Sequence, residues 1–371
     1  MTNLASAGPR QLSPTEAIAA TDESQDRPRA VTAMTTDYWL TLAGSLIGSL
    51  GLVWLFYTQI LPFSGVVGFV ISWYVVYIAM FATVTAMVHS APIVRDRLWT
   101  AIITGAAGLV GFALVSTIVY IVIKGWPALH HVNFFIQSES AGSPTSPLTQ
   151  GGVLNAIIGS VFELGIATII SVPLGIGTAV FTVEVGGRFA RVVRTVVEAM
   201  TALPDILAGL FIYSFLILSL GYQRTGLAAA TALSVMMLPI IARASDVALR
   251  VVPGGLREAS LALGGTQWRT ILRVVIPTAA PGLAQAVILG MARAVGETAP
   301  VLICSAPSIF TNANPFNNPM NSLPLYIYTA VRSGLPLFIE RGFAAAVVLL
   351  AYVLILFGAA RLLARSKVAR R

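Results

Sequence analysis

The stretch that decides the fold is REASLALGGTQWRTILRVVIPTAAPG, residues 257–282, a polar and arginine-bearing segment within a strongly apolar chain. Pro253 and Gly254–Gly255 come just before it, good helix formers follow, and Gly264–Gly265 interrupts them. Proline and small residues suit the start of a helix, whereas glycine suits its end. The pattern predicts a short isolated helix in a loop between membrane-spanning segments.

The composition places the chain in a lipid bilayer. Of its 371 residues, 56% are hydrophobic and 10% are charged, and the mean hydropathy is +0.83, whereas soluble proteins are about 25% charged. The 23 basic residues exceed the 15 acidic ones, but they occur singly at the ends of apolar runs, which indicates a membrane surface and not a nucleic acid. Cys304 is the only cysteine, and His130–His131 is the nearest approach to a ligand pair, so no disulfide, metal or cofactor is expected.

Long apolar segments recur along the chain. A transmembrane helix needs about 20 mostly apolar residues, and eight segments meet this condition. The predicted fold is therefore all-α, a polytopic membrane protein with about eight transmembrane helices. The predicted spans are residues 38–61, 65–88, 98–123, 153–183, 193–219, 225–243, 280–303 and 342–364.

The positions of lysine and arginine predict the orientation, because cytoplasmic loops carry an excess of both. With the N-terminus inside, 18 of the 23 basic residues lie in cytoplasmic segments and 4 in outer segments, while Arg293 lies within a span. Both termini are therefore predicted to be cytoplasmic, and the loop 244–279 faces the same side. The loops 124–152 and 304–341 face outward and are rich in Pro, Ser, Asn and Gly.

One face of the short loop helix is apolar. Leu256, Ala259 and Leu263 fall at i, i+3 and i+7, while Arg257 and Glu258 lie off this stripe. A helix of this length is marginally stable alone in water, so it would gain stability by docking into a groove on a partner. The alternative is a loop helix that packs only on its own bundle.

The same segment resembles the EAA loop of ABC importer permeases, in which Glu-Ala-Ala is followed at fixed spacing by Gly and by Ile-x-Leu-Pro. Glu258, Ala259 and Ser260 match the triplet, with serine in place of the last alanine, and Gly264 and Pro277 match the later positions. The resemblance implies that this helix couples the chain to a separate ATPase subunit. The chain has no Gly-Lys-Ser/Thr of a P-loop, so it is not expected to be an enzyme.

A second unusual segment is RAVGETAP, residues 293–300, inside the seventh predicted span. A charge at bilayer depth costs roughly 3 kcal/mol or more, so Arg293 and Glu297 are functional candidates. They are four residues apart and are predicted to pair on one helical face. The pair either locks the bundle or serves as a gate or anion site, since the arginine fork suits an anion. This chemistry does not choose phosphate over sulfate or a carboxylate.

RAVGETAP together with NPFNNPMNSLPLYIY, residues 314–328, resembles the PstA-type permeases of phosphate-specific ABC importers. With further matching stretches, the resemblance covers roughly residues 98–364. It implies a six-helix ABC type-1 (MetI-like) permease core and transport of inorganic phosphate. The candidate residues of the path or gate are Arg293, Glu297, Thr298 and Asp205.

The resemblance also implies partners and a location. The partners are two copies of an ABC ATPase subunit, a second homologous permease of the PstC type and an extracytoplasmic phosphate-binding protein, and the location is a bacterial inner membrane. The predicted organisation is a disordered cytoplasmic tail at 1–37, a two-helix extension at 38–97, the permease domain at 98–364 with its coupling loop at 253–277, and a basic cytoplasmic tail at 365–371.

Two acidic residues depart from this pattern. Asp205 stands where the family commonly has serine, and Glu163 lies in an otherwise apolar span or near its end. A carboxylate near the path should repel phosphate unless it is protonated or paired, for instance with Arg293. Three alternatives therefore stay open: an ABC permease for another oxyanion or polar solute, an ion-coupled secondary transporter that relays protons through these groups, and a membrane scaffold without a path.

Overall fold

The computed structural model describes residues 36–60 and 65–368, and every regular element within them is helical. The predicted all-α class is therefore confirmed. The predicted disordered tail at 1–37 lies outside the described residues except for its last two, and the predicted basic tail at 365–371 lies outside them from residue 369 onward.

The chain forms two compact units, Met1–Leu114 and Val115–Arg371. The division falls inside α4 (Ala91–Leu129), as does the predicted start of the permease domain at residue 98. Besides the first part of α4, the first unit contains α2 (Thr36–Leu55), η1 (Phe56–Ile60) and α3 (Val66–Val88). In this unit, α2 packs on α3 around a core that includes Tyr77 and Phe81.

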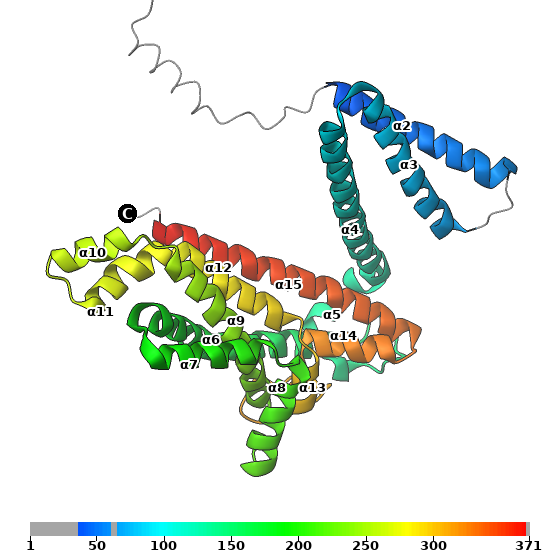
Figure 1. The fold of residues 1–371 in the computed structure, drawn as a ribbon. Coiled ribbons are helices and arrows are strands. Elements are labelled where there is room, and N and C mark those ends of the chain that lie inside the picture. The colour runs from blue at the N-terminus through cyan, green and yellow to red at the C-terminus, as the bar shows by residue number, and fades with distance from the viewer. Residues whose placement is uncertain (1–35, 61–64, 369–371) are drawn as a thin grey trace, which may run out of the picture. The chain divides into compact units, whose positions relative to one another are not determined.

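The central helix of the second unit is α9 (Gly226–Arg250), which packs against α6, α7, α8, α12 and α13 (Figure 1). Ile241 on α9 lies against two glycines: a Cβ on Gly175 would be 2.9 Å from its Cγ2, and one on Gly290 would be 2.6 Å from its Cγ1. Glycine at these positions lets α6 (Leu154–Val180) and α12 (Ile276–Val295) approach α9 closely.

The remaining elements of this unit complete the bundle and its loops. The remaining elements are α5 (Asn133–Ile136), η2 (Glu139–Ala141), η3 (Phe181–Val185), α7 (Gly187–Thr201), α8 (Asp205–Ile212), η4 (Tyr213–Ser219), α10 (Gly254–Ala262), α11 (Gln267–Thr270), η5 (Ile271–Val275), α13 (Ala299–Cys304), α14 (Leu323–Arg332) and α15 (Pro336–Val368). Among them, α14 packs on α15, and α15 packs on α12.

The described residues contain seven helices long and apolar enough to cross a membrane, or eight if one bent pair counts as a span. The predicted number of about eight is confirmed. The bent pair is Gly187–Thr201 with Asp205–Ser219, which meet at 105°. The fifth predicted span, 193–219, was therefore wrong as a continuous helix. Leu203 precedes Pro204, and the residue before proline is disfavoured in the α conformation, so the helix breaks there.

The seventh predicted span, 280–303, also combines two helices. α12 ends at Val295 and α13 begins at Ala299, and Pro300 occupies the first turn of α13. Proline suits the first turn of a helix but not its interior. The motif RAVGETAP therefore marks a break in a membrane helix, which hydropathy alone does not show.

The two predicted outer loops are folded and joined to each other. Arg341 on α15 is 4% exposed and donates to four backbone oxygens of the first loop, at 2.8–3.2 Å. Asn155 at the start of α6 donates from Nδ2 to the Ser308 oxygen at 2.7 Å, and Ser140 N donates to the Ile309 oxygen at 3.0 Å. These bonds fix both loops at one end of the bundle.

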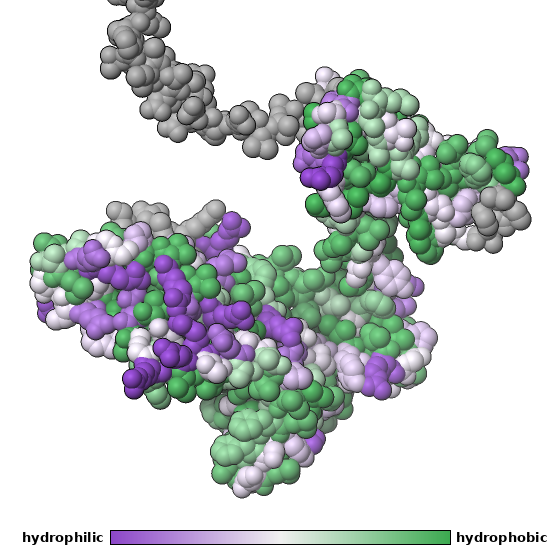
Figure 2. All heavy atoms as spheres, viewed as in Figure 1, coloured by the Kyte–Doolittle hydropathy of each residue, from purple (hydrophilic) through white to green (hydrophobic). Residues whose placement is uncertain are grey.

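Polarity is unevenly distributed over the second unit. Figure 2 shows hydrophilic side chains gathered where α10 and α11 lie, and apolar side chains over α8 and η4. A polar end and an apolar flank are what a membrane-spanning bundle requires, because its flank faces lipid and its ends face water.

Candidate functional site

Arg293 lies in the last turn of α12 and forms ion pairs with two carboxylates. One belongs to Asp205 at the start of α8, and the other to Glu297, whose Oε1 is 3.5 Å from Arg293 Nε. The predicted pairing of Arg293 with Glu297 is confirmed, and Asp205, for which the sequence left protonation or pairing open, is paired with Arg293. Glu297 lies in the break after α12 and not on the helix itself, but its backbone N–H bonds to the Ala294 oxygen at 3.1 Å and keeps it close.

This arginine lies where the two broken membrane helices meet. α8 packs against α13, and a Cβ on Gly209 would lie 2.8 Å from Pro300 Cα. Cys304 donates from Sγ to the Gly209 oxygen at 3.3 Å. Asp205 begins α8, where a negative charge is favoured by the helix dipole. Thr298 precedes α13, and its side chain makes no capping hydrogen bond.

A cavity of about 180 Å³ adjoins the Arg293–Asp205 pair. Besides these two charged residues its wall is mostly apolar, so the pair is its principal polar feature. The side chains of Arg293 and Asp205 are 51% and 33% exposed, which leaves guanidinium N–H groups available to an anion. The other lining residues are Met200, Thr201, Leu203, Ala208, Val235, Met236, Pro239 and Ile240.

Glu163 lies well inside α6 and not near its end. It is 1% exposed, and its Oε1 has no hydrogen-bond partner among the described residues. It lines a cavity of about 10 Å³ together with Glu297, Ser322 and Tyr352. A volume of this size is close to that of one water molecule.

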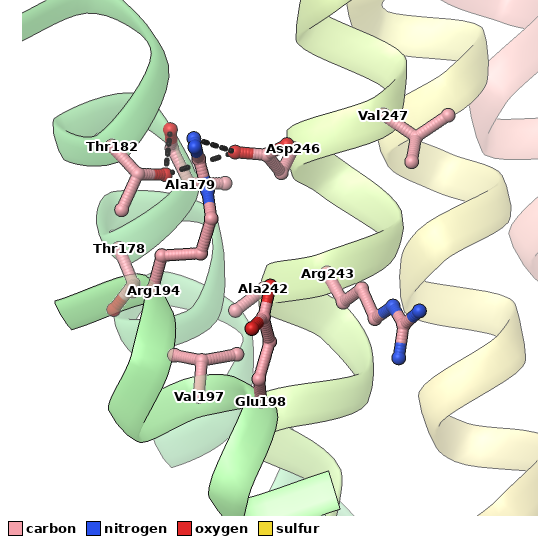
Figure 3. A pocket seen from close by; sticks show the side chains of 10 residues that line it. All are labelled: Thr178, Ala179, Thr182, Arg194, Val197, Glu198, Ala242, Arg243, Asp246 and Val247. Carbon is pink, nitrogen blue, oxygen red and sulfur yellow. Dashed lines mark hydrogen bonds and ion pairs between the residues drawn. The ribbon is translucent and has the colours of Figure 1, made fainter. Parts of the chain in front are cut away.

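A cluster around Asp246 was not predicted from the sequence. Thr182 Oγ1 and Arg194 Nη2 each donate to Asp246 Oδ1 at 3.1 Å, and Arg250 Nε donates to Oδ2 at 2.6 Å. Figure 3 shows the first two contacts in a cavity of about 140 Å³ between α6, α7 and α9. The i, i+4 spacing of Asp246 and Arg250 was the only signal in the sequence.

The predicted loop helix is confirmed as α10, Gly254–Ala262. Gly264 follows it with φ +80°, a left-handed conformation that favours glycine. The predicted stripe is exposed: Leu256 is 42% and Leu263 is 90% accessible, and Ala259 is exposed as well.

The predicted coupling residues lie on different faces of this loop. Glu258 and Ala259 are exposed, whereas Ser260 turns inward and its Oγ is 2.8 Å from Thr270 Oγ1. Pro277 lies in the first turn of α12. The loop therefore exposes Glu258 beside the apolar stripe, while Ser260 faces the rest of the loop.

Arg257 is a second residue that the sequence did not single out as a site. It lies on the inner face of α10, and its Nη2 donates to Glu184 Oε1 at 2.7 Å. Glu184 belongs to η3, which continues α6 at its C-terminal end.

Known proteins resemble a large part of this chain. Residues 171–368 match the family model described as binding-protein-dependent transport system inner membrane component. A phosphate transport system permease protein PstA 1 of Mycobacterium tuberculosis is 42% identical over 217 residues, which are 58% of this chain and 71% of that protein. The PstA protein of Haemophilus influenzae is 38% identical over 210 residues, covering 56% and 72%.

An inward-facing structure of the MetNI methionine ABC transporter is 23% identical, with a TM-score of 0.46, and covers 58% of this chain and 94% of that one. The family match spans more than half of the chain, and the PstA proteins are matched over more than two thirds of their length. This multi-pass inner-membrane chain therefore belongs to the family of binding-protein-dependent transport system inner membrane components, among its PstA-type permeases.

Proposed function

We propose that this chain is the transmembrane permease subunit of an ATP-driven ABC importer of inorganic phosphate. The observation that carries the proposal is Arg293, held between two carboxylates at the meeting point of two broken membrane helices and beside a cavity. The identity of the substrate is inferred from the phosphate transport permeases that resemble the chain.

Arg293 is proposed to contact the anion on its way through the membrane. Its planar fork provides parallel N–H donors that match a phosphate. When no anion is present, the guanidinium is paired with Asp205 and Glu297. When phosphate arrives, it replaces one carboxylate as a partner. The Thr298 hydroxyl lies in the same helix break and is proposed as a further donor to the path.

The exposed stripe of α10 is proposed to dock into a groove of a separate ATPase subunit. Its apolar residues are accessible to a partner, and an apolar helix face in a groove is a common mode of recognition. The coupling residues are Glu258, Ala259, Ser260, Gly264 and Pro277. ATP binding would draw α10 inward and turn the transporter from inward-open to outward-open.

The proposed assembly contains two ATPase copies, a second permease of the PstC type and an external phosphate-binding protein. Both termini of this chain and the loop 244–279 are proposed to face the cytoplasm. The permease domain is proposed to span residues 98–364, preceded by a two-helix extension at 38–97. The family assignment does not favour the ion-coupled alternative, because the relatives are ABC permeases.

The test is ATP-dependent uptake of radiolabelled phosphate into vesicles that hold this chain with its neighbouring ATPase, second permease and binding protein. We expect saturable uptake that excess sulfate does not inhibit. ATP hydrolysis without phosphate uptake would refute phosphate as the substrate, but it would leave the proposed role as an ABC importer permease in place. Uptake that needs no ATPase and collapses with the proton gradient would instead support a secondary transporter.

A further inference from the structure

Arg257 uses its whole guanidinium group to hold neighbouring elements. Its Nε lies 3.2 Å from both Glu184 oxygens, and its Nη2 donates to Glu184 Oε1 at 2.7 Å. Its Nη1 donates to the Val252 oxygen at 2.7 Å, and its Nη2 also donates to the Leu249 oxygen at 3.0 Å. Arg257 thereby joins α10 both to the C-terminal end of α9 and to Glu184 on η3.

The Arg257–Glu184 pair is well shielded from water. The side chains are 23% and 8% exposed, respectively. A forked arginine–carboxylate pair is geometrically specific, and removing one partner leaves the other charge buried and uncompensated. This pair is therefore a stiffer connection than an ion pair on the protein surface, which contributes little to stability.

Glu184 is also held from the other side of the loop. Gln267 in α11 donates from Nε2 to the Glu184 backbone oxygen at 2.8 Å. Thus α10, before the Gly264–Gly265 turn, binds the side-chain carboxylate of Glu184, and α11, after the turn, binds the backbone carbonyl of Glu184. Within the loop, the Ser260–Thr270 hydroxyl contact ties α10 to α11.

The two faces of α10 separate docking from attachment. Leu256, Ala259 and Leu263 are exposed, whereas Arg257 and Ser260, three residues apart, turn toward the body of the protein. Because a single short helix carries both faces, a displacement of its outer face also moves Arg257.

Glu184 lies at the end of a continuous helical segment, Leu154–Val185, that crosses the unit. This segment packs along α9, and it carries Glu163, which shares a small cavity with Glu297 of the Arg293 site. A force applied at Glu184 therefore acts on the membrane helix that lies next to the candidate gate.

We infer that Arg257 and Glu184 form the mechanical link that transmits displacement of α10 to the membrane helix Leu154–Val185. The inference rests on the proposed coupling role of the loop and adds the attachment point within the permease. Arg257 and Glu184 are positioning residues, since they act through other groups and do not touch the substrate path.

The first test compares Arg257→Gln, Glu184→Gln and the double variant in the full reconstituted transporter, with Arg188→Gln as the matched control. Arg188 is an exposed arginine on α7 outside this loop. We expect the three link variants to retain the ATPase subunit and hydrolyse ATP, while the ATP hydrolysed per phosphate imported rises about tenfold, the factor that a coupling within the usual range for contacting residues produces.

The double variant should be no worse than Arg257→Gln, because that variant already removes the contact that Glu184→Gln removes. Arg257→Lys should lose part of the coupling, since an ammonium is a point charge that lacks the guanidinium fork. Additive effects of the two single variants, or wild-type coupling in both, would overturn the inference.

A second test does not depend on phosphate. Spin labels at Val185→Cys and Gly255→Cys, in a Cys304→Ala background, report the separation of α10 from the end of the membrane helix. Val185 is 51% exposed, and a Cβ on Gly255 meets no atom within 4 Å.

In the labelled protein that keeps Arg257 and Glu184, we expect one narrow distribution of label–label distances that ATP does not change. In Arg257→Gln, we expect this distribution to broaden or shift when ATP is added. An unchanged narrow distribution in Arg257→Gln would overturn the inference. If the wild-type complex imports no phosphate, the proposed substrate fails, whereas this distance measurement still decides the link.

Discussion

Single residues at the candidate gate have roles that depend on partners distant in the sequence. Arg293 and Glu297 were paired correctly from their spacing, but Asp205 lies 88 positions from Arg293 and was only one possible partner. Arg257 and Glu184 are 73 positions apart, and neither was identified as a site from the sequence. A charge in an apolar helix is conspicuous in a sequence, whereas the identity of its partner depends on which helix faces meet.

Asp205→Asn should increase the affinity of the gate for phosphate. The variant removes a carboxylate that competes with the anion for Arg293. Because the pair is partly exposed, the effect should be small, at most about fivefold in the KM for phosphate uptake. Arg293→Gln should raise the KM instead. A higher KM in Asp205→Asn would mean that this carboxylate positions the arginine and does not compete with the substrate.

Glu163→Met should not lower the thermal stability of the isolated chain in detergent. Replacing a buried carboxyl that has an unpaired oxygen with an apolar group of similar size is nearly neutral or stabilising. Asn155→Leu is the control on the same helix: its side chain is buried and bonded on both sides, to Ser308 O at 2.7 Å and from Glu139 N at 3.3 Å. It should lower the Tm. An equal loss in both variants would mean that the Glu163 carboxyl is satisfied by a bound water.

At the scale of elements, hydropathy predicted where helices lie better than where they break. The span at 225–243 corresponds to α9 apart from Thr225, its N-cap, and the short helix predicted between Pro253 and Gly264–Gly265 corresponds to α10. The breaks before Asp205 and after Val295 were missed. Proline was present at both, but hydropathy windows average over such a position, and a proline inside an apolar run is compatible with a continuous kinked helix.

Gly159→Ala should destabilise the packing of α6 against the loop 304–341. A Cβ at this position would lie 1.8 Å from the Asn321 backbone oxygen, so the backbone must shift, at a cost of about 1–3 kcal/mol or more. The measurement is thermal unfolding of the isolated chain in detergent. Gly165→Ala is the control, because its Cβ meets nothing within 4 Å and alanine favours the helix. Equal Tm values for the two variants would contradict the packing argument.

Glu258→Lys should leave the chain in the membrane and uncouple ATP hydrolysis from phosphate uptake. The side chain is exposed on α10, so the change reverses a charge on the docking helix without disturbing the core. Uptake and hydrolysis are measured in the same vesicles. Wild-type coupling in this variant would remove the argument that α10 docks on the ATPase.

At the scale of the whole molecule, the positive-inside rule predicts that α10 and the loop 304–341 lie on opposite sides of the membrane. Both carry small exposed residues suited to labelling, Ala262 and Ala313. In a Cys304→Ala background, a membrane-impermeant thiol reagent applied to intact cells should label Ala313→Cys and spare Ala262→Cys. Permeabilised cells should label both. The reverse pattern would overturn the orientation of the chain.

The sequence by itself determined that the chain is a membrane protein, that it has about eight apolar helices, that a short helix lies between Pro253 and Gly264–Gly265 and that it resembles PstA-type permeases. These features depend on composition, local periodicity and short motifs, which a sequence contains directly. Only the tertiary structure decided that Asp205 pairs with Arg293, that Arg257 holds Glu184 and that Glu163 is buried without a protein partner among the described residues. Such contacts join segments far apart in the chain, and they depend on how helices rotate and pack against one another, which local patterns do not specify.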